Sequence, residues 1–367
     1  MRLLVSGGGT GGHVYPILAV LQQLTSENTS PTEVKYVGSA SGIEADLATR
    51  AGWPFQDIST ASLKGSSPWT LLPRIIRLAR GTAQSLRVID RFSPQAVLAT
   101  GGYVCAPPIV AAWMRGVPTL VYLPDLTPGL AIRFLTRFAT AIAVSFPESK
   151  NYFPPGKAVV TGYPVREELF KTDKVSARRK LRLDESEKTL LVFGGSQGAH
   201  SINSAVSDAL EKLLQMCQVV HIGGDTDAPW LQARRDELPP ALAEKYTVCA
   251  YLHDEMIAAL AAADLVVARA GAATTAEFPA VGLPSILIPY PYAGKHQELN
   301  ADYMVHNGAA VRIDDGDLKE GILLQTVSDL LADQRKLDRL GDGARRLARP
   351  DAARRIAGLL KDIAHPN

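Results

Sequence analysis

Near its N-terminus the chain reads Arg2-Leu-Leu-Val-Ser6, followed directly by Gly7-Gly-Gly-Thr-Gly-Gly12. A short apolar run that ends in glycines is typical of a buried strand leading into a tight turn. The apolar stretch from Ile17 to Leu24 then favours a helix. Glycines between a strand and a helix let the backbone approach an anion, and the helix start presents N–H groups to it. The N-terminus therefore predicts the opening strand, loop and helix of an α/β domain.

The same pattern recurs about half a chain later. Thr189-Leu-Leu-Val-Phe193 reads as a second buried strand, Gly194-Gly-Ser-Gln-Gly198 as a second glycine turn, and a helix-like stretch follows. A chain of 367 residues is also long for a single core. We therefore expect two similar α/β domains.

The remaining strand candidates alternate with helical stretches, which predicts parallel, doubly wound sheets. These candidates are Val34–Val37, Ala96–Ala99, Thr119–Tyr122, Ala141–Val144, Val219–Ile222, Leu265–Val267 and Ser285–Ile288. The boundary is predicted within Gly162-Tyr-Pro-Val-Arg166, giving domains 1–163 and 164–340. The Arg- and Ala-rich tail, about 341–367, is predicted to form a helix that packs back on the first domain.

Composition excludes several classes of protein. A net charge of +2 gives no overall field that calls for nucleic acid. Three widely spaced cysteines fit reduced thiols and exclude a disulfide framework. No apolar run reaches the roughly 18 residues of a spanning helix, so we expect a soluble or peripheral protein.

Two other ligand classes are considered and disfavoured. Gly7, Gly9 and Gly12 match a dinucleotide-binding G-x-G-x-x-G, but no acidic residue is clearly placed about twenty positions on. The same glycines also suit a plain tight turn. The acidic pairs Asp225/Asp227 and Asp315/Asp317 read better as turn residues than as metal ligands, and neither metal nor cofactor is expected.

The order of the motifs resembles the MurG family, the undecaprenyl-diphospho-muramoylpentapeptide N-acetylglucosaminyltransferases. The resemblance runs from Leu3 to about Ile313 and rests on these segments: Gly7–Pro16, Thr100–Val104, Gly194–Ala199, Ala268–Glu277, Gly282–Pro289, and His296-Gln297 with Asn300. It implies the GT-B fold, two Rossmann-like doubly wound domains facing across a cleft. It also implies inverting transfer of N-acetylglucosamine from UDP-N-acetylglucosamine to lipid-linked N-acetylmuramoyl-pentapeptide at the inner face of the cell membrane.

The resemblance assigns the donor to the second half of the chain. It implies Glu277 on the ribose, Leu252 on uracil with Tyr251 packed over the nucleotide, and Gln297 on the sugar hydroxyls. The other implied contacts are Ser196, Gln197 and Arg166 on the phosphates, Ala272 and Thr274 at the phosphate–sugar end, and His296 and Asn300 near the sugar. Three alternatives stay open: a solvated Glu277, a Tyr251 in core packing, and a surface His296, where the family commonly has glutamine.

The acceptor side centres on His13, which follows Thr10, Gly11 and Gly12 at a predicted helix start. An imidazole there can accept a proton near neutral pH, although it can also merely cap or pack the helix. The family usually reads His-Glu-Gln-Asn before Pro-Gly, whereas this chain reads Tyr122-Leu-Pro-Asp125. We expect His13 and Asp125 to act as a pair at the acceptor hydroxyl.

The segment from Trp69 to Arg91 predicts a basic amphipathic helix that suits an anionic membrane. Its apolar residues are Leu71, Leu72, Ile75, Ile76 and Ala79, and its basic neighbours are Lys64, Arg74, Arg77, Arg80 and Arg87; Trp113 can join it. The alternative is a helix that packs on its sheet.

Two other functions stay open for the whole chain. One is another GT-B transferase with a lipid or secondary-metabolite acceptor, and the other is a non-catalytic nucleotide-sugar sensor.

Overall fold

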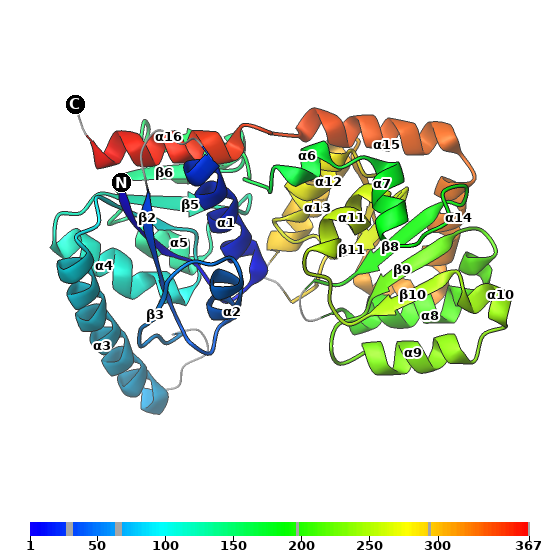
Figure 1. Cartoon of the computed structure of the whole chain (residues 1–367), viewed down its shortest axis with the longest axis horizontal. Coiled ribbons are helices and arrows are strands. Elements are labelled where there is room, and N and C mark those ends of the chain that lie inside the picture. The colour runs from blue at the N-terminus through cyan, green and yellow to red at the C-terminus, as the bar shows by residue number, and fades with distance from the viewer. Residues whose placement is uncertain (27–31, 63–67, 196–197, 293–294, 366–367) are drawn as a thin grey trace. The chain divides into compact units, whose positions relative to one another are not determined.

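The computed structural model describes residues 1–26, 32–62, 68–195, 198–292 and 295–365 (Figure 1). The chain forms two compact units. The first comprises Met1–Arg166 together with Asp351–Asn367, and the second comprises Glu167–Pro350. In the described part of the chain, no helix is both long and apolar enough to cross a membrane.

The first unit is built on seven parallel strands in the order β3-β2-β1-β4-β5-β6-β7. The central strands are apolar throughout because both faces of the sheet are covered. The strands are β1 (Arg2–Ser6), β2 (Glu33–Gly38), β3 (Phe55–Asp57), β4 (Ala96–Ala99), β5 (Thr119–Leu123), β6 (Ala141–Val144) and β7 (Ala158–Val160).

Helices cover this sheet on both faces. On one face α16 packs against α1 and lies along β4, β5 and β6, whereas α3 packs against α4 on the other. The helices of this unit are α1 (Gly11–Ser26), α2 (Ile43–Arg50), α3 (Pro68–Phe92), α4 (Ala106–Met114), α5 (Leu130–Leu135) and α16 (Ala352–Ala364), with the 3-10 turns η1 (Tyr103–Cys105) and η2 (Pro147–Tyr152).

The second unit repeats the architecture with six parallel strands in the order β10-β9-β8-β11-β12-β13. They are β8 (Thr189–Phe193), β9 (Gln218–Ile222), β10 (Tyr246–Cys249), β11 (Leu265–Ala268), β12 (Ser285–Leu287) and β13 (Ala310–Arg312). Its helical segments are α6 (Glu168–Lys171), α7 (Lys174–Lys180), α8 (His200–Leu214), α9 (Ala228–Asp236), α10 (Pro240–Ala243), α11 (Glu255–Ala262), α12 (Thr274–Val281), α13 (His296–His306), η3 (Asp315–Glu320), α14 (Ile322–Leu331) and α15 (Gln334–Leu347).

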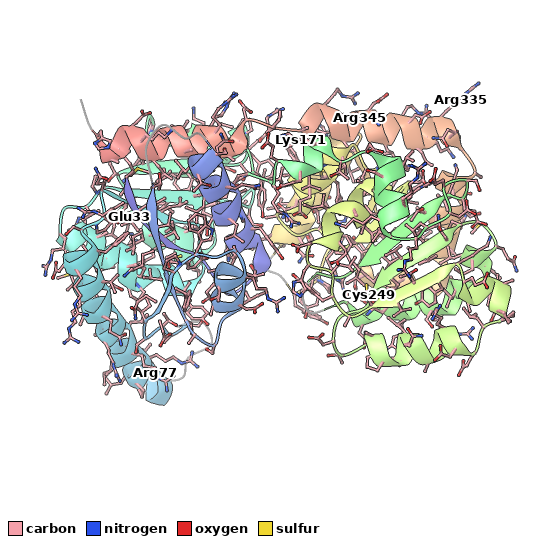
Figure 2. The ribbon with its side chains drawn as sticks, in the orientation of Figure 1. Glu33, Arg77, Lys171, Cys249, Arg335 and Arg345 are labelled. Atoms are coloured by element: carbon pink, nitrogen blue, oxygen red, sulfur yellow. The ribbon has the colours of Figure 1, made fainter. Side chains whose placement is uncertain are left out.

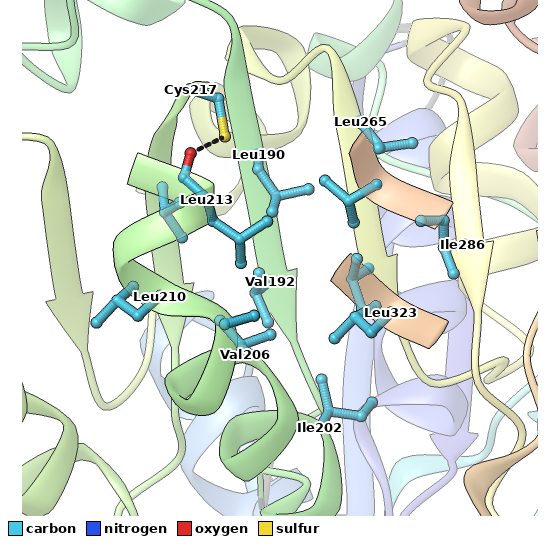
Figure 3. Packing of buried hydrophobic residues seen from close by; sticks show 14 of the residues in the cluster. Leu190, Val192, Ile202, Val206, Leu210, Leu213, Cys217, Leu265, Ile286 and Leu323 are labelled. Carbon is cyan, nitrogen blue, oxygen red and sulfur yellow. Dashed lines mark hydrogen bonds between the residues drawn. The ribbon is translucent and has the colours of Figure 1, made fainter. Parts of the chain in front are cut away.

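The core of the second unit shows why α8 lies where it does. Its residues Ile202, Val206 and Leu210 recur at helical spacing and are fully or almost fully buried (Figure 3). They pack against strand residues that include Leu190 of β8 and Leu265 of β11. This one apolar stripe fixes the helix that follows the second glycine turn.

Both sheets therefore have the doubly wound order that the alternating strands and helices predicted. In each sheet the order reverses beside the first strand of the domain, between β1 and β4 and between β8 and β11. Loops leaving the two strands at such a point turn to opposite faces, so ligands of α/β proteins bind there. The glycine motifs occupy these loops: Gly7–Gly12 and Thr100–Val104 in the first unit, and Gly194, Gly195, Gly198, Ala199 and Arg269–Ala273 in the second.

The C-terminal tail differs from its prediction. The expected single helix from about residue 341 is two helices, α15 and α16, separated at residues 348–351. Helix α15 belongs to the second unit, where Gly282, at φ +64°, would bring a Cβ within 2.6 Å of Nε of Arg345. Only α16 packs on the first unit, because Pro350 interrupts the helical backbone between them.

Candidate functional site

The first glycine loop is held by hydrogen bonds along its backbone. The hydroxyl of the buried Tyr36 donates to Gly7 O at 2.5 Å, and Gly8 N–H donates to Gly101 O at 3.3 Å. Gly9 has φ +82°, which only glycine adopts without strain. Helix α1 begins directly afterwards, with His13 N–H bonded to Thr10 O at 3.1 Å.

The imidazole of His13 is oriented by this loop. Its Nδ1 lies 2.9 Å from Gly8 O, with the Thr10 hydroxyl also near at 3.3 Å. A carbonyl oxygen only accepts, so Nδ1 carries the proton and the neutral ring has its lone pair on Nε2. A Cβ on Gly101 would lie 3.0 Å from that Nε2, so the absence of a side chain at Gly101, in the loop after β4, leaves the space that the ring occupies.

The other predicted residues of this loop have structural partners in the same unit. Gly11 is the first residue of α1, and Gly12 O accepts a hydrogen bond from the Tyr163 hydroxyl at 3.2 Å. Arg166 lies over the ring of Tyr15, 5.6 Å from its centroid. This stacking holds the guanidinium beside the start of α1. Its predicted phosphate contact stays a prediction.

Asp125 reaches the same edge of the sheet from β5. Only β4 separates β5 from β1, so the ends of β1 and β5 are about 10 Å apart at two strand spacings. Asp125 is half-buried, while Tyr122 before it is fully buried with its hydroxyl 2.6 Å from Ser145 Oγ. Burial raises the pKa of Tyr122 well above its ordinary value, and the charge of Asp125 adds to the rise. The pairing of Asp125 with His13 stays a prediction.

Glu44 is a residue of this site that the sequence analysis missed. It is fully buried on α2, and its carboxylate accepts hydrogen bonds from Gly9 N–H at 3.2 Å and Ser39 N–H at 3.1 Å. A signal was present in the sequence, since Glu44 follows the second strand of the domain and the glycines Gly38 and Gly42. A carboxylate therefore lies behind the first glycine loop.

The second glycine loop has a different support. Gly195 (φ +93°) and Gly198 (φ +77°) take left-handed backbone, and Gly198 N–H bonds Gly195 O at 3.0 Å. A Cβ on Gly198 would lie 2.3 Å from Gly223 O, so this loop presses against the end of β9. The predicted diphosphate contacts Ser196 and Gln197 lie outside the described residues.

The loop after β11 is braced internally. The hydroxyl of Thr274, which is buried, donates to Gly271 O at 2.6 Å. The buried Asn300 donates through Nδ2 to Ala270 O at 3.1 Å. These side-chain groups shape the loop, and the partly exposed Ala272 is left at its surface. Glu277 stands one turn further into α12 and is half-buried.

Arg269 is a second residue that the sequence analysis missed. It is nearly buried, forms an ion pair with Asp315, and donates to Ser201 Oγ at 2.9 Å. Ser201 in turn donates to Asp315 at 2.7 Å. The network joins the β11 loop, the start of α8 and η3. It gives the Asp315 carboxylate, considered above as a metal ligand, an arginine as its partner.

The remaining predicted donor residues lie at the carboxyl ends of the neighbouring strands. Tyr251 and Leu252 follow β10 and are half-buried, with the Tyr251 ring 4.6 Å from that of His253. His296 begins α13 and is half-buried. Gln297 accepts from Tyr290 N–H through Oε1 at 2.9 Å. Ligand contacts of these residues stay predictions.

A buried polar chain supports Gly223. Asn203 donates to Gly223 O and to Asp227, each at 2.8 Å, and accepts from His221 Nε2 at 3.0 Å. The Tyr246 hydroxyl then donates to His221 Nδ1 at 2.8 Å. Burial lowers the pKa of His221 to about 3, so the ring is neutral near pH 7. Its proton lies on Nε2, which faces Asn203 Oδ1, and Nδ1 is therefore left to accept from Tyr246. Asp227, one of the four carboxylates considered for metal, accepts from Asn203 and His200.

This buried histidine predicts a loss of stability in acid. The unfolded state takes up a proton below about pH 6.5, whereas folded His221 does so only near pH 3. The second unit should therefore lose about 2 kcal/mol of stability from this group between pH 7 and pH 5. His221→Gln should flatten that part of the pH dependence in urea unfolding, and the exposed control His306→Gln should not. An unchanged slope in His221→Gln contradicts the neutral assignment.

Helix α3 presents a separate surface on the first unit. A Cβ on Gly81 would lie 1.9 Å from Ser59 O, so the helix packs closely from there onward. Before Gly81 it is largely exposed: Leu72 is 64% and Ile76 59% exposed, and the labelled Arg77 projects from this part (Figure 2). The alternative of packing on the sheet is thus wrong for residues 71–80. Trp113 is exposed on α4, whereas Lys64 and the side chain of Trp69 lie outside the described structure.

Comparison with known proteins agrees with this architecture. Residues 3–144 match the glycosyltransferase family 28 N-terminal domain and residues 189–356 its C-terminal domain. The chain is 40% identical to a UDP-N-acetylglucosamine–N-acetylmuramyl-(pentapeptide) pyrophosphoryl-undecaprenol N-acetylglucosamine transferase of Desulforudis audaxviator, over 99% of each chain. A relative of the same name in Roseiflexus sp. is 39% identical over 99% of this chain and 95% of its own length.

A solved structure gives the same result. The crystal structure of Acinetobacter baumannii MurG superposes with a TM-score of 0.74 at 25% identity, covering 98% of this chain and 99% of that one. The sequence relatives exceed 35% identity over nearly their whole length, and both domains of the family are matched. The chain therefore belongs to glycosyltransferase family 28, and within it to the MurG family of N-acetylglucosamine transferases.

Proposed function

We propose that this enzyme transfers N-acetylglucosamine from UDP-N-acetylglucosamine to the C4 hydroxyl of lipid-linked N-acetylmuramoyl-pentapeptide, a step of peptidoglycan synthesis. The observation that carries the proposal is the likeness to transferases of that name over 99% of the chain. The switch points of both sheets support it, because each presents the motif residues at a ligand-binding edge.

The proposed reaction is a single displacement with inversion at the anomeric carbon. The acceptor oxygen attacks that carbon as its proton passes to Nε2 of His13, and UDP leaves with the electrons of the broken bond. Backbone N–H groups at the second glycine loop and at the start of α12 would stabilise the charge that develops on the diphosphate. Glu277 would hold the ribose hydroxyls, and no cofactor takes part in this scheme.

The direct test measures UDP release from UDP-N-acetylglucosamine with a soluble analogue of the muramoyl-pentapeptide lipid. Turnover that requires the acceptor and yields the disaccharide supports the proposal. Donor binding without acceptor-dependent turnover would identify a nucleotide-sugar sensor instead. Turnover with a diacylglycerol or small aromatic acceptor, but none with the muramoyl lipid, would assign the enzyme to another reaction of this fold.

The donor assignment predicts a kinetic effect for Glu277→Ala. Loss of a charge-assisted hydrogen bond to ribose costs about 1.5–3 kcal/mol, so the donor KM should rise roughly ten-fold or more. The thermal transition should stay close to that of the parent, because Glu277 is only half-buried. Glu244→Ala, at an exposed position of the same unit, is the matched control. Unaltered donor kinetics in folded Glu277→Ala would remove this carboxylate from the site.

The catalytic pair predicts different outcomes for His13→Ala and Asp125→Asn. Loss of a general base typically lowers the rate about 10²- to 10⁴-fold, and we expect this for His13→Ala with the donor KM nearly unchanged. If Asp125 only hydrogen-bonds the acceptor, Asp125→Asn keeps most of kcat. If Asp125 is the base, kcat falls by at least the lower factor. Full activity in both variants would place the base elsewhere.

We place the enzyme at the cytoplasmic face of the cell membrane, as a peripheral protein held by α3. The support is chemical: exposed Leu71, Leu72, Ile75 and Ile76 lie among arginines on residues 71–80. Apolar side chains enter the interface of a bilayer, and guanidinium groups interact with anionic headgroups. An acceptor carried by a long lipid requires this kind of proximity.

This membrane contact predicts that α3 variants release the protein from vesicles. Ile75→Ser with Ile76→Ser should weaken binding to anionic phospholipid vesicles, and Arg77→Gln and Arg80→Gln should each remove about 1 kcal/mol of attraction. Sedimentation with vesicles measures both effects. Val175→Ser, at an exposed apolar position of the second unit, is the control. Unchanged sedimentation of the α3 variants would exclude this surface.

A further inference from the structure

Glu44 is an unusual carboxylate for a protein interior. It is fully buried, and among the described residues no lysine or arginine nitrogen lies within 4.0 Å to pair with it. Two glycines leave the space that the Glu44 carboxylate occupies. A Cβ on Gly8 would lie 2.4 Å from the carboxylate, and a Cβ on Gly42 would lie 2.3 Å from it. A buried charge without an ion pair lowers stability unless hydrogen bonds compensate it. In place of an ion pair, the Glu44 carboxylate accepts hydrogen bonds from Gly9 N–H and Ser39 N–H, one at each oxygen.

The peptide group between Gly8 and Gly9 connects Glu44 to the imidazole. On one side, Gly9 N–H donates to Glu44 Oε2 at 3.2 Å. On the other side, Gly8 O accepts from His13 Nδ1 at 2.9 Å. The N–H and C=O of a trans peptide point in opposite directions, so this one group bridges carboxylate and ring. The bridge spans 31 residues of sequence, from His13 to Glu44.

We propose that Glu44 is a positioning residue that sets the protonation and orientation of His13 through the Gly8–Gly9 peptide. This inference rests on the proposed function, in which Nε2 of His13 takes the acceptor proton. A negative charge at the N–H end polarises the peptide and makes its oxygen a stronger acceptor. The proton is thereby kept on Nδ1, and the lone pair is kept on Nε2.

Glu44 also holds the peptide in one of two orientations. Glycine on both sides leaves the peptide free to rotate, since Gly8 and Gly9 have no Cβ to oppose a flip. A flipped peptide would present N–H to His13 Nδ1 and favour the other tautomer.

The two acidic groups near Glu44 are neutral. Burial raises the pKa of the Cys105 thiol to about 11 and the pKa of the Tyr36 hydroxyl well above its usual value, and the charge of Glu44 raises both further.

The decisive measurement is the tautomer of His13 by long-range ¹H–¹⁵N NMR of histidine-labelled protein, with His13→Ala used to assign its signals among seven histidines. The parent should carry the proton on Nδ1 in its neutral form. Glu44→Gln, which loses the charge and cannot accept at both N–H groups, should show a mixture. A parent ring protonated on Nε2 would overturn the proposal, even if Glu44→Gln did not fold.

Kinetic measurements provide a second test of the role of Glu44. Glu44→Gln should lower kcat about ten-fold or more and leave the donor KM within about two-fold, whereas Glu33→Gln, exposed at the start of β2 (Figure 2), should change neither. In a His13→Ala background, Glu44→Gln should have no further effect on kcat, because the two act as one unit. Glu44→Asp, one methylene shorter, should fall between parent and Glu44→Gln.

Two kinetic outcomes contradict the proposal even where acceptor-dependent turnover is present. Parental kcat in folded Glu44→Gln, or an equal loss of kcat in parent and His13→Ala backgrounds, would show that Glu44 does not act through His13. A parent without acceptor-dependent turnover would contradict the proposed function instead, and the tautomer measurement would still decide whether Glu44 sets the ring.

Discussion

Backbone-to-backbone contact between two glycine loops is the constraint on which the first unit depends. Gly8 N–H bonds Gly101 O, and a Cβ on Gly102 would lie 2.4 Å from Gly8 O. Side chains at these positions would force the loops apart. With the loops in contact, the carbonyl that orients His13 and the space for its ring are both fixed by main chain.

The two units use the same strand order but support their glycine loops differently. In the first unit a carboxylate, Glu44, takes the Gly9 N–H from within the fold. In the second unit the loop presses on Gly223, whose carbonyl oxygen accepts a hydrogen bond from Asn203, and Asn203 also donates to the buried carboxylate of Asp227. The first loop thus bonds a carboxylate directly through Gly9 N–H, whereas in the second unit Asn203 lies between Gly223 and the carboxylate.

Central elements were predictable because both faces of their strands are buried. β1, β4, β6 and β8 occupy the residues predicted for them, and β5, β9, β11 and β12 agree within one residue. The four strands that were not predicted, β3, β7, β10 and β13, are the four edges of the two sheets. Edge strands are short and partly exposed, so they lack the continuous apolar run that marks a central strand.

The contacts of Glu44 with Gly9 and of Arg269 with Asp315 were not predicted, because their residues lie far apart in the sequence and only the folded chain brings them together. Thr274 and Asn300, expected at the ligand, direct hydrogen bonds to the loop itself.

In the proposed reaction the switch point of the second sheet holds the donor nucleotide, whereas that of the first sheet does not. Hydrogen–deuterium exchange with and without UDP-N-acetylglucosamine tests it directly. We expect slower amide exchange in peptides that cover residues 194–199 and 269–277, with no change at residues 7–12 and 100–104. Protection at residues 7–12, with none at 194–199, would contradict it.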